Sequence, residues 1–550
     1  MCQRCRLGTQ FSQSASIIDG CCAARAPWGE HDENYITAYR HDSWVPSNKH
    51  LYARLFGAFA ALGACLYGYD GVYFTGVSAM DAFIEHFGER QSDGSYAIAA
   101  SSFSLMTSVI NIGELVGSLS AAPLNDVVGR KGVFFVASIM VVVGVILQLA
   151  TDHKHSMIIG GRILLGYGVG NFSVTSPLYI GEIAPTRIRG PLLMCWQLVL
   201  SVSQIVAAAI NRGTQGIDST VAYRVPMGVQ LIFPLIVLTF LWWIPESPRW
   251  LLRKNKVEAA RNSLQSVNRD DKTYVADDDL ATLQRDVYNE KQLAEDSSWL
   301  DLILDPIERR KTIYSAGALI AQQVNGIQWF YYFDTVFSKA IGLSDPFLMT
   351  LIVFIIQVVV VLCAVFCANK LPRRPLLLIT TGIMGVSIFI VGCLGIPGGE
   401  VSHTFGKVII SFVIIEITAF NFAWGPLGWT IASEMAVGRN RNKIYAVAVA
   451  CFWVTVWAIV FTLPYLYYSA NLGPKTGFVY TGLCVITFVY VYFCVGEVTG
   501  RSMEEINWFF INGIPARKWR DQPFPVIGAP SEGSLEVNEK NGVKVGVEGP

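Results

Sequence analysis

The sequence predicts an all-α membrane protein with twelve transmembrane helices, arranged as two pseudo-symmetric six-helix bundles that a cytosolic helical linker joins. Three observations support this prediction. Of the 550 residues, 52% are hydrophobic and only 15% are charged, whereas soluble domains usually carry about 25% charged residues. Twelve apolar runs are long enough to cross a hydrocarbon core of about 30 Å. Finally, charged motifs at the ends of these runs recur in the second half of the chain.

The composition also excludes several classes of protein. Lysine plus arginine and aspartate plus glutamate number 42 each, so no excess of positive charge indicates a nucleic-acid partner. Most of the 12 cysteines lie in apolar runs, and Cys2 and Cys5 have no second pair with which to form a zinc site. The polar segments contain no nucleophile–base set, metal cluster or phosphate loop. We therefore expect that the protein is not an enzyme and that it binds no cofactor and no metal. We also expect it to function as a monomer.

The chain divides into five parts where apolar and polar composition alternate. These are an N-terminal tail, the first bundle, the linker, the second bundle and a C-terminal tail, with the bounds 1–50, 51–244, 245–311, 312–496 and 497–550. The linker contains helix-like runs such as Lys256–Val267, which favour a helical bundle over a disordered segment. Both tails, the second from about Asn507, are polar and rich in turn formers, so we expect them to be solvated and flexible.

The apolar runs have a clear charge asymmetry. Arginine and lysine cluster after runs two, four, eight and ten, and the positive-inside rule places these ends in the cytosol, together with the linker and both termini. The twelve runs are centred near Gly63, Gly113, Val142, Leu165, Val202, Val237, Gln323, Val358, Val386, Phe420, Val456 and Val485.

Two pairs of motifs show that the second half of the chain repeats the first. Asp126–Lys131 follows run two, and Asn369–Arg374 follows run eight at the matching place. Glu182–Gly190 follows run four, and Glu434–Arg441 follows run ten. Internal repeats with a site at the repeat interface are typical of secondary transporters. A pseudo-symmetric channel would not explain charged clusters at the same helix ends in both halves.

Several short motifs occur in one order along the chain. They are Gly68–Val72, Asp126–Lys131, Gly161–Gly170, Pro177–Gly190, Pro245–Leu252, Gln322–Ile327 followed by Tyr331 and Tyr332, and Gly425–Trp429 followed by Glu434. Together they resemble the sugar porters of the major facilitator superfamily, in their fungal branch, from about Leu51 to Phe509. The resemblance implies the major facilitator fold and a plasma-membrane transporter of a monosaccharide or related polyol that works by alternating access.

The resemblance also implies a substrate site and an extracellular gate. Amide side chains can donate to and accept from sugar hydroxyls without the desolvation cost of a charge, although a lone glutamine in a membrane helix often only bridges helices. Tyr331 and Tyr332 are the implied extracellular gate, although aromatic residues at a span end also anchor helices at the interface. The implied substrate-binding residues are Gln197, Gln322, Gln323, Gln328 and Trp429.

A third implied site is a cytosolic gate made of charged side chains. We expect Glu182 to pair with Arg130, and Glu434 with Arg373 or Arg374, when the two halves close on the cytosolic side. These pairs would break when the site opens inward. The alternative is that these are ordinary interfacial charges. The implied gate residues are Asp126, Arg130, Glu182, Arg189, Glu246, Arg249, Arg373, Arg374, Glu434 and Arg441.

Charged side chains also lie within the hydrocarbon region, where they usually mark a pathway or have a partner. In the proton-coupled sugar porters that this chain is similar to, an aspartate in span one and an arginine in span four form the coupling pair. Asp70 and Arg162 match these positions, which favours proton symport, with facilitated diffusion as the alternative. Glu114 and Glu416 lie outside the motifs and are either buried helix contacts or functional acids.

The departures from the family pattern limit the choice of substrate. Gln328 and Phe452 stand where the family usually has asparagine, and Val437 stands where proline is usual. The motif after run twelve, usually Pro-Glu-Thr-Lys-Gly, is reduced to Gly496–Gly500. A disaccharide, a quinate-like acid, inositol or a secondary metabolite therefore remains an alternative substrate. A non-transporting sugar sensor is a further alternative, but sensors of this fold usually have a longer tail.

Overall fold

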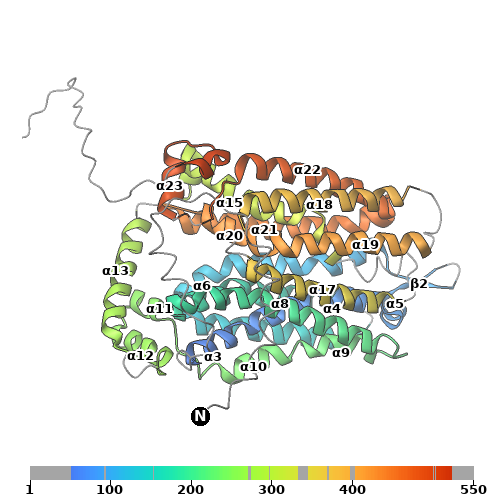
Figure 1. Cartoon of the computed structure of the whole chain (residues 1–550). Coiled ribbons are helices and arrows are strands. Elements are labelled where there is room, and N and C mark those ends of the chain that lie inside the picture. The colour runs from blue at the N-terminus through green and yellow to red at the C-terminus, as the bar shows by residue number, and fades with distance from the viewer. Residues whose placement is uncertain are drawn as a thin grey trace, which may run out of the picture. The chain divides into compact units, whose positions relative to one another are not determined.

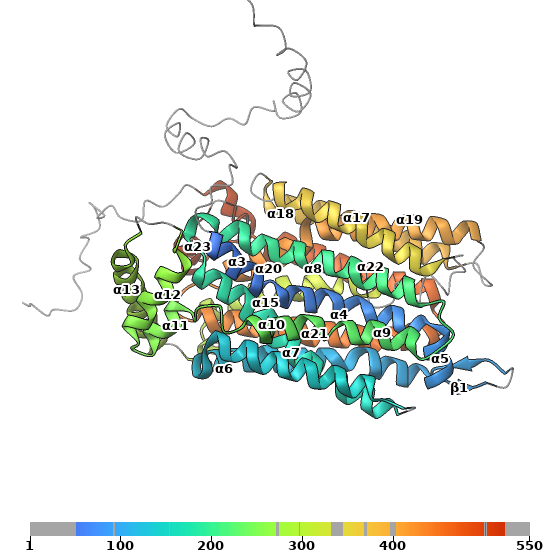
Figure 2. The same ribbon diagram turned by 90° about the horizontal axis from the view of Figure 1, so that it is seen from below.

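The computed structural model describes one helical body. The described residues are 51–91, 94–152, 154–270, 274–295, 298–331, 345–367, 371–396, 403–499, 501 and 503–522. Figures 1 and 2 show long helices running side by side, with α11, α12, α13 and α23 at one end and α5 with the β1–β2 hairpin at the other. We call these the linker end and the far end.

The first half of the chain forms helices α3 to α10 and a short hairpin. In the hairpin, β1 (Glu89–Arg90) pairs antiparallel with β2 (Tyr96–Ala97), so that Glu89 faces Ala97. The helices are α3 (Leu51–Ala60), α4 (Leu62–Ala79), α5 (Asp81–Phe87), α6 (Ala100–Leu149), α7 (His155–Ile183), α8 (Thr186–Thr214), α9 (Val221–Val229) and α10 (Ile232–Phe240).

The predicted linker contains four helices: α11 (Pro248–Arg253), α12 (Val257–Val267), α13 (Ala276–Glu295) and α14 (Asp301–Leu304). A small apolar core of Leu251, Leu252, Ala260 and Leu280 holds α11, α12 and α13 together. Helix α15 (Pro306–Val324) starts earlier than the boundary at 312 that we drew from the sequence. The Asp305 side chain explains this start, because it caps the helix by accepting a hydrogen bond from the Ile307 N–H at 2.9 Å.

The second half continues from α15 with further long helices. Two π-helical turns interrupt it, one of them (η1) directly before the Gly425–Trp429 motif, and such turns are frequent at functional sites. The elements are α17 (Pro346–Cys367), α18 (Arg373–Leu394), α19 (His403–Ala419), η1 (Phe420–Trp424), α20 (Gly425–Met435), α21 (Arg441–Pro464), η2 (Tyr465–Ser469), η3 (Gly473–Lys475), α22 (Thr476–Cys494), α23 (Met503–Ile511) and η4 (Ala516–Asp521).

Among the described residues, nine helical stretches are long and apolar enough to cross a membrane. One of them, α6, contains both predicted spans two and three. Helices α8 and α15, which contain predicted spans five and seven, are not among the nine. The helices therefore occur where the apolar runs predicted them, and the count of twelve spans stays a prediction. The two halves meet where α6 packs on α21 and α8 packs on α17.

A bend at Gly129 separates the two spans within α6. Its φ of 79° and ψ of 178° are outside the helical region, and a side chain there would meet Glu246, since an added Cβ would lie 2.5 Å from Oε2. Pro372 precedes α18 at the matching position of the second half, with a φ of −67°. The residue before the following helical segment thus has a different backbone conformation in each half.

The end of the described chain differs from our expectation. We expected the residues after about Asn507 to be solvated, but α23 and η4 pack against the second half. Phe509 and Trp519 are fully buried, with ring centroids 5.3 Å apart. Gly496 leaves room for the indole, because an added Cβ would lie 2.1 Å from its Cε3 atom. Phe509, Phe510 and Trp519 together bury enough apolar surface to order this segment.

We predict that Gly129→Ala destabilises the protein. A side chain in this backbone conformation costs about 1–3 kcal/mol, and it would also displace the Glu246 carboxylate. The midpoint of thermal unfolding of the detergent-solubilised protein should fall. Gly160→Ala is the control, because an added Cβ at Gly160 meets no atom within 4 Å; equal midpoints for the two variants would contradict this account of the bend.

Candidate functional site

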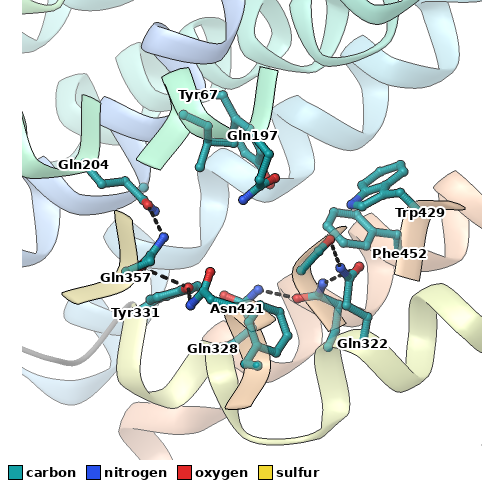
Figure 3. A pocket seen from close by; sticks show the side chains of 15 residues that line it. Tyr67, Gln197, Gln204, Gln322, Gln328, Tyr331, Gln357, Asn421, Trp429 and Phe452 are labelled. Carbon is teal, nitrogen blue, oxygen red and sulfur yellow. Dashed lines mark hydrogen bonds between the residues drawn. The ribbon is translucent and has the colours of Figure 1, made fainter. Parts of the chain in front are cut away.

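A cavity lies between the two halves of the described chain (Figure 3). Its empty volume is about 690 Å³, which includes the open solvent at its mouth. The first half contributes Tyr67, Gly71, Gln197, Leu200 and Gln204, and the second half contributes Gln322, Gln323, Gln328, Tyr331, Gln357, Phe420, Asn421, Gly425, Trp429 and Phe452.

Most of these 15 lining residues carry an amide group or an aromatic ring. Seven carry amides, five carry aromatic rings, and none carries a charge. Amides donate and accept hydrogen bonds, as a hydroxyl group requires, and aromatic rings cover apolar faces. The cavity therefore suits an uncharged solute that has both hydroxyl groups and C–H surfaces.

One series of hydrogen bonds orders the amides of the second half. The Gln322 amide nitrogen donates to the carbonyls of Trp424 (2.8 Å) and Gly425 (3.1 Å), where η1 meets α20. Gln323 donates to Gln322 at 3.3 Å, and Gln328 donates to Gln323. Three glutamines are thereby held in fixed orientations before any solute binds, which lowers the entropy cost of binding.

A second series joins the two halves across the cavity. Asn421 donates to the Tyr331 hydroxyl at 2.8 Å, and this hydroxyl donates to the Gln357 carbonyl at 3.2 Å. The Gln357 nitrogen then donates to Gln204 on α8 at 2.7 Å. The last bond of this series thus connects α17 of the second half with α8 of the first half.

All five predicted substrate-binding residues line the cavity, and their contact with a solute stays a prediction. Gln204, Gln357 and Asn421 also line the cavity, and the sequence motifs did not single them out. A signal was present, since each is an amide inside an apolar run and Gln204 lies two helical turns after Gln197. Phe452, noted as a departure, also lines the cavity.

The predicted extracellular gate is described only in part. Tyr331 lies in the cavity wall, where its ring stacks on Phe354, and its backbone carbonyl accepts a hydrogen bond from Thr75 of the first half at 3.5 Å. Tyr332 lies outside the described residues. Arg212 at the end of α8 forms an ion pair with Asp345, directly before α17. Polar contacts between the halves thus extend from the cavity to the far end.

At the linker end, the predicted pair of the first half is present. Arg130, which is 2% exposed, donates through two nitrogens to the two oxygens of Glu182, at 2.8 Å and 2.6 Å. Glu246 accepts the backbone N–H groups of Arg130 and Lys131 at 3.0 Å and 3.2 Å, where the second part of α6 begins. Burial raises the pKa of Glu246, and the backbone donors oppose this shift.

The second half repeats this arrangement. Arg373 forms an ion pair with Glu434, whereas Arg374 instead donates to the Tyr492 carbonyl at 2.9 Å. Glu497 accepts the N–H groups of Arg373 and Arg374 at 3.1 Å and 3.2 Å, at the start of α18. We missed the role of Glu497, because it lies in a motif that we noted only as reduced.

The remaining predicted gate residues differ in exposure. Asp126 is exposed and accepts a hydrogen bond from Arg253 at 3.3 Å. Arg249 is half-buried and Arg441 is exposed, and the Arg189 side chain lies outside what the structure describes. Because Arg130–Glu182 and Arg373–Glu434 each join elements of one half, their part in closing the cytosolic side stays a prediction.

Among the ionisable side chains that are buried in the described helices are Asp70, Glu114, Arg162 and Glu416. Arg162 donates to the Tyr73 hydroxyl at 3.0 Å and lies 3.9 Å from the Phe74 ring centroid. No ion pair joins it to Asp70 among the contacts of the described residues, so the predicted coupling pair stays a prediction. Asp70, Glu114 and Glu416 are 3%, 1% and 0% exposed.

Known proteins resemble this chain along most of its length. The sequence profile of the family "Sugar (and other) transporter" matches residues 56–510. The low-affinity glucose transporter HXT4 of Saccharomyces cerevisiae (strain JAY291) is 30% identical over 516 residues, which cover 92% of this chain and 89% of that protein. The major facilitator-type transporter ecdD of Aspergillus rugulosus is 31% identical over 490 residues, which cover 85% and 90% of the two chains.

Solved structures have the same fold. The inward open conformation of the xylose transporter XylE from E. coli matches with a TM-score of 0.68 at 22% identity, over 83% of this chain and 99% of that one. The proton:xylose symporter XylE bound to 6-bromo-6-deoxy-D-glucose matches with a TM-score of 0.67 at 22% identity, over 85% and 100%. The expected major facilitator fold is thereby confirmed.

We predict that Glu182→Gln strongly destabilises the first half. The substitution leaves the buried Arg130 guanidinium without a counter-charge, and breaking a buried pair costs about 3–5 kcal/mol. Thermal unfolding of the purified protein should show this loss. Asp126→Asn is the matched control, since it removes a carboxylate from the exposed pair with Arg253, where the cost is about 0–1 kcal/mol. Similar midpoints for both variants would refute the structural role of the Arg130–Glu182 pair.

Proposed function

The chain belongs to the sugar (and other) transporter family, and from this premise we propose that it moves an uncharged monosaccharide or related polyol across the plasma membrane. Members of this family are multi-pass membrane transporters and not enzymes. The observation that carries the proposal is the cavity between the halves, with seven amides and no charged side chain among its lining residues. A sugar hydroxyl that leaves water finds both donors and acceptors there.

The contacts between the halves support alternating access as the mechanism. The hydrogen bond that Gln357 donates to Gln204 connects α17 with α8. The ion pair between Arg212 and Asp345 connects the end of α8 with the residue before α17. They must separate when the cavity opens at the far end, while the paired charges at the linker end keep each half rigid. Rocking of one half against the other then exposes the solute to each side in turn. In this proposal the linker end and both termini are cytosolic.

We further propose that a proton accompanies the sugar. Asp70 is buried, and its Oδ1 atom has no hydrogen-bond partner among the described residues. A carboxylate in this situation is more stable when protonated. Arg162 lies near enough for its charge to act on Asp70, so protonation changes the balance of charge within the first half. A structural relative bears the name proton:xylose symporter, whereas HXT4 is named a low-affinity glucose transporter.

A second candidate solute is a neutral molecule with fewer hydroxyl groups than glucose, or with an apolar substituent. The observation that favours it is Phe452, which lines the cavity and packs on Trp429 with ring centroids 4.8 Å apart. An aromatic ring offers no hydrogen bond to a hydroxyl group. A quinate-like acid fits less well, because the lining residues include no cation to balance a carboxylate.

The direct test is uptake by the purified protein in liposomes, with hexoses, pentoses, polyols, disaccharides and cyclic acids offered at two external pH values. We expect saturable uptake of a neutral monosaccharide or polyol. If no sugar moves down either a substrate gradient or a proton gradient, the proposed function is wrong.

We predict that Gln197→Leu weakens sugar binding. Gln197 lines the cavity from α8, and the loss of one hydrogen bond of about 1–1.5 kcal/mol raises the KM for uptake about tenfold. Gln265→Leu on the exposed face of α12 is the control and should leave KM unchanged. An unchanged KM for Gln197→Leu would remove this residue from the site.

We also predict that Asp70→Asn abolishes accumulation of sugar against its gradient and preserves exchange. Asparagine keeps the size of the side chain but binds no proton, so the imposed proton gradient no longer drives the cycle. Accumulation under a pH gradient and counterflow at equal pH measure the two activities separately. Accumulation that survives the substitution shows that the proton is not coupled through Asp70.

A further inference from the structure

Besides the Arg130–Glu182 pair, the described interior of the first half holds two acidic side chains and one basic side chain. Asp70 on α4, Glu114 on α6 and Arg162 on α7 are 3%, 1% and 1% exposed. The charge of Arg162 acts on both carboxyl groups, and the charge of Asp70 acts on Glu114. One guanidinium can balance only one of the two carboxylates, and a second uncompensated charge inside the membrane is strongly unfavourable.

The packing of the three helices brings these side chains together. An added Cβ at Gly170 of α7 would lie 2.3 Å from the Glu114 carbonyl oxygen, so α6 and α7 touch through their backbones at Glu114. The Tyr73 hydroxyl accepts a hydrogen bond from Arg162 at 3.0 Å, which joins α7 to α4 one turn from Asp70. Helix α7 packs on both α4 and α6. An added Cβ at Gly113, next to Glu114, would lie 2.3 Å from the carbonyl oxygen of Ile163, next to Arg162. We call this part of α7, with its neighbours on α4 and α6, the junction.

Each of the three side chains also has an unsatisfied polar atom. Asp70 Oδ1, Glu114 Oε2 and Arg162 Nε are fully buried and have no hydrogen-bond partner in the described part of the chain. A buried carboxylate oxygen without a donor costs several kcal/mol. A proton on one carboxyl group removes one charge and supplies a donor, as in known pairs of acids that share a site.

We propose that Glu114 is a second proton-binding residue, which shares with Asp70 one proton of the transport cycle. This inference rests on the proposed proton-coupled sugar transport. An O–H bond forms when a carboxylate of the pair takes a proton from water at the far end. The same bond breaks when the proton leaves to water at the linker end. With the proton bound, the two carboxyl groups and Arg162 are together neutral.

Tyr67 connects this pair of acids to the cavity. Its side chain lines the cavity opposite the glutamines of the second half, and both Glu114 and Asp70 act on it electrostatically. Its ring also lies edge-on to Trp453 of the second half, with centroids 5.9 Å apart. A change of charge at the two acids therefore alters the electrostatic surroundings of Tyr67, which faces both the cavity and the second half.

Few other titratable groups approach Glu114. Tyr67 and Asp70 face it from α4, and Arg162 faces it from α7. Helix α21 also packs on α6, but its charged residues, Arg441 and Lys443, lie in its first turn at the linker end. Helix α10 carries no titratable residue, and in α9 Tyr223 and Arg224 belong to the far end. The charged groups that act on Glu114 are therefore Asp70 and Arg162.

The test compares Glu114→Gln with the unmodified protein in liposomes that contain a pH-sensitive dye. Sugar uptake is measured across a series of external pH values, together with the protons that enter per sugar. We expect Glu114→Gln to shift the pH midpoint of uptake by at least about one unit and to lower the number of protons per sugar. Counterflow exchange at equal pH should stay within about twofold.

Glu416→Gln is the matched control. Glu416 is also fully buried, and both of its oxygens lack a hydrogen-bond partner among the described residues, but it lies on α19 in the other half. Its substitution should leave the pH midpoint unchanged. If Glu114→Gln cannot be purified and reconstituted in liposomes, Glu114→Asp is measured in its place. This variant keeps a titratable group and moves it by one methylene. A shifted midpoint supports the inference, and an unchanged one overturns it.

The possible failures are distinguishable. If the unmodified protein moves sugar with protons and Glu114→Gln keeps the same midpoint and the same ratio, the inference is wrong and the proposed function stands. Sugar uptake without any proton movement in the unmodified protein also overturns the inference, while sugar transport remains. If the unmodified protein moves no sugar at all, the proposed function fails, and this inference fails with it.

Discussion

The fold depends on one interaction that occurs twice: a glutamate that accepts the first backbone N–H groups of a helix at the linker end. Glu246 does this for the second part of α6, and Glu497 for α18. A negative charge is favourable at a helix N-terminus, where free N–H groups and the helix dipole meet. Each cap lies beside an arginine–glutamate pair of the same half. The start of the capped helix is thus fixed in each half by contacts within that half.

This rigidity at the linker end explains where the molecule can change shape. The described polar contacts that cross between the halves lie at the cavity and towards the far end. At the cavity, Gln357 donates to Gln204 and Ser201, and Thr75 donates to the Tyr331 carbonyl. Towards the far end, Ser104 donates to the Phe461 carbonyl, and Arg212 pairs with Asp345. The hydrogen bonds at the cavity join neutral groups and exchange for bonds to water or to a hydroxylated solute at small net cost. The ion pairs Arg130–Glu182 and Arg373–Glu434 each lie within one half, whereas the contacts between halves are mostly neutral. This distribution suits the proposed rocking of one half against the other.

Much of this structure follows from the sequence, because membrane burial restricts what each residue can do. The apolar runs predicted the helices, and the repeated motifs predicted the Arg130–Glu182 and Arg373–Glu434 pairs, since a charge at a helix end needs a partner. Glu497 was missed because capping depends on backbone N–H groups that no motif shows. Gln357 and Asn421 were missed because a single amide in an apolar run can either bridge two helices or line a cavity. Only the packing of the two halves distinguishes these two roles.

In the proposed transport cycle, the cavity and the pair of buried acids have separate tasks in separate environments. Seven amides and no charged side chain line the cavity, whereas Asp70, Glu114 and Arg162 lie buried within one half, where α7 packs on both α4 and α6. Tyr67 on α4 lines the cavity, and the charges of both acids act on it. In this proposal, a different residue in place of Phe452 changes which solute fits and leaves both acids in their surroundings. The proposed substrate and coupling ion can then vary independently, as long as α4 transmits the charge of the junction to the cavity.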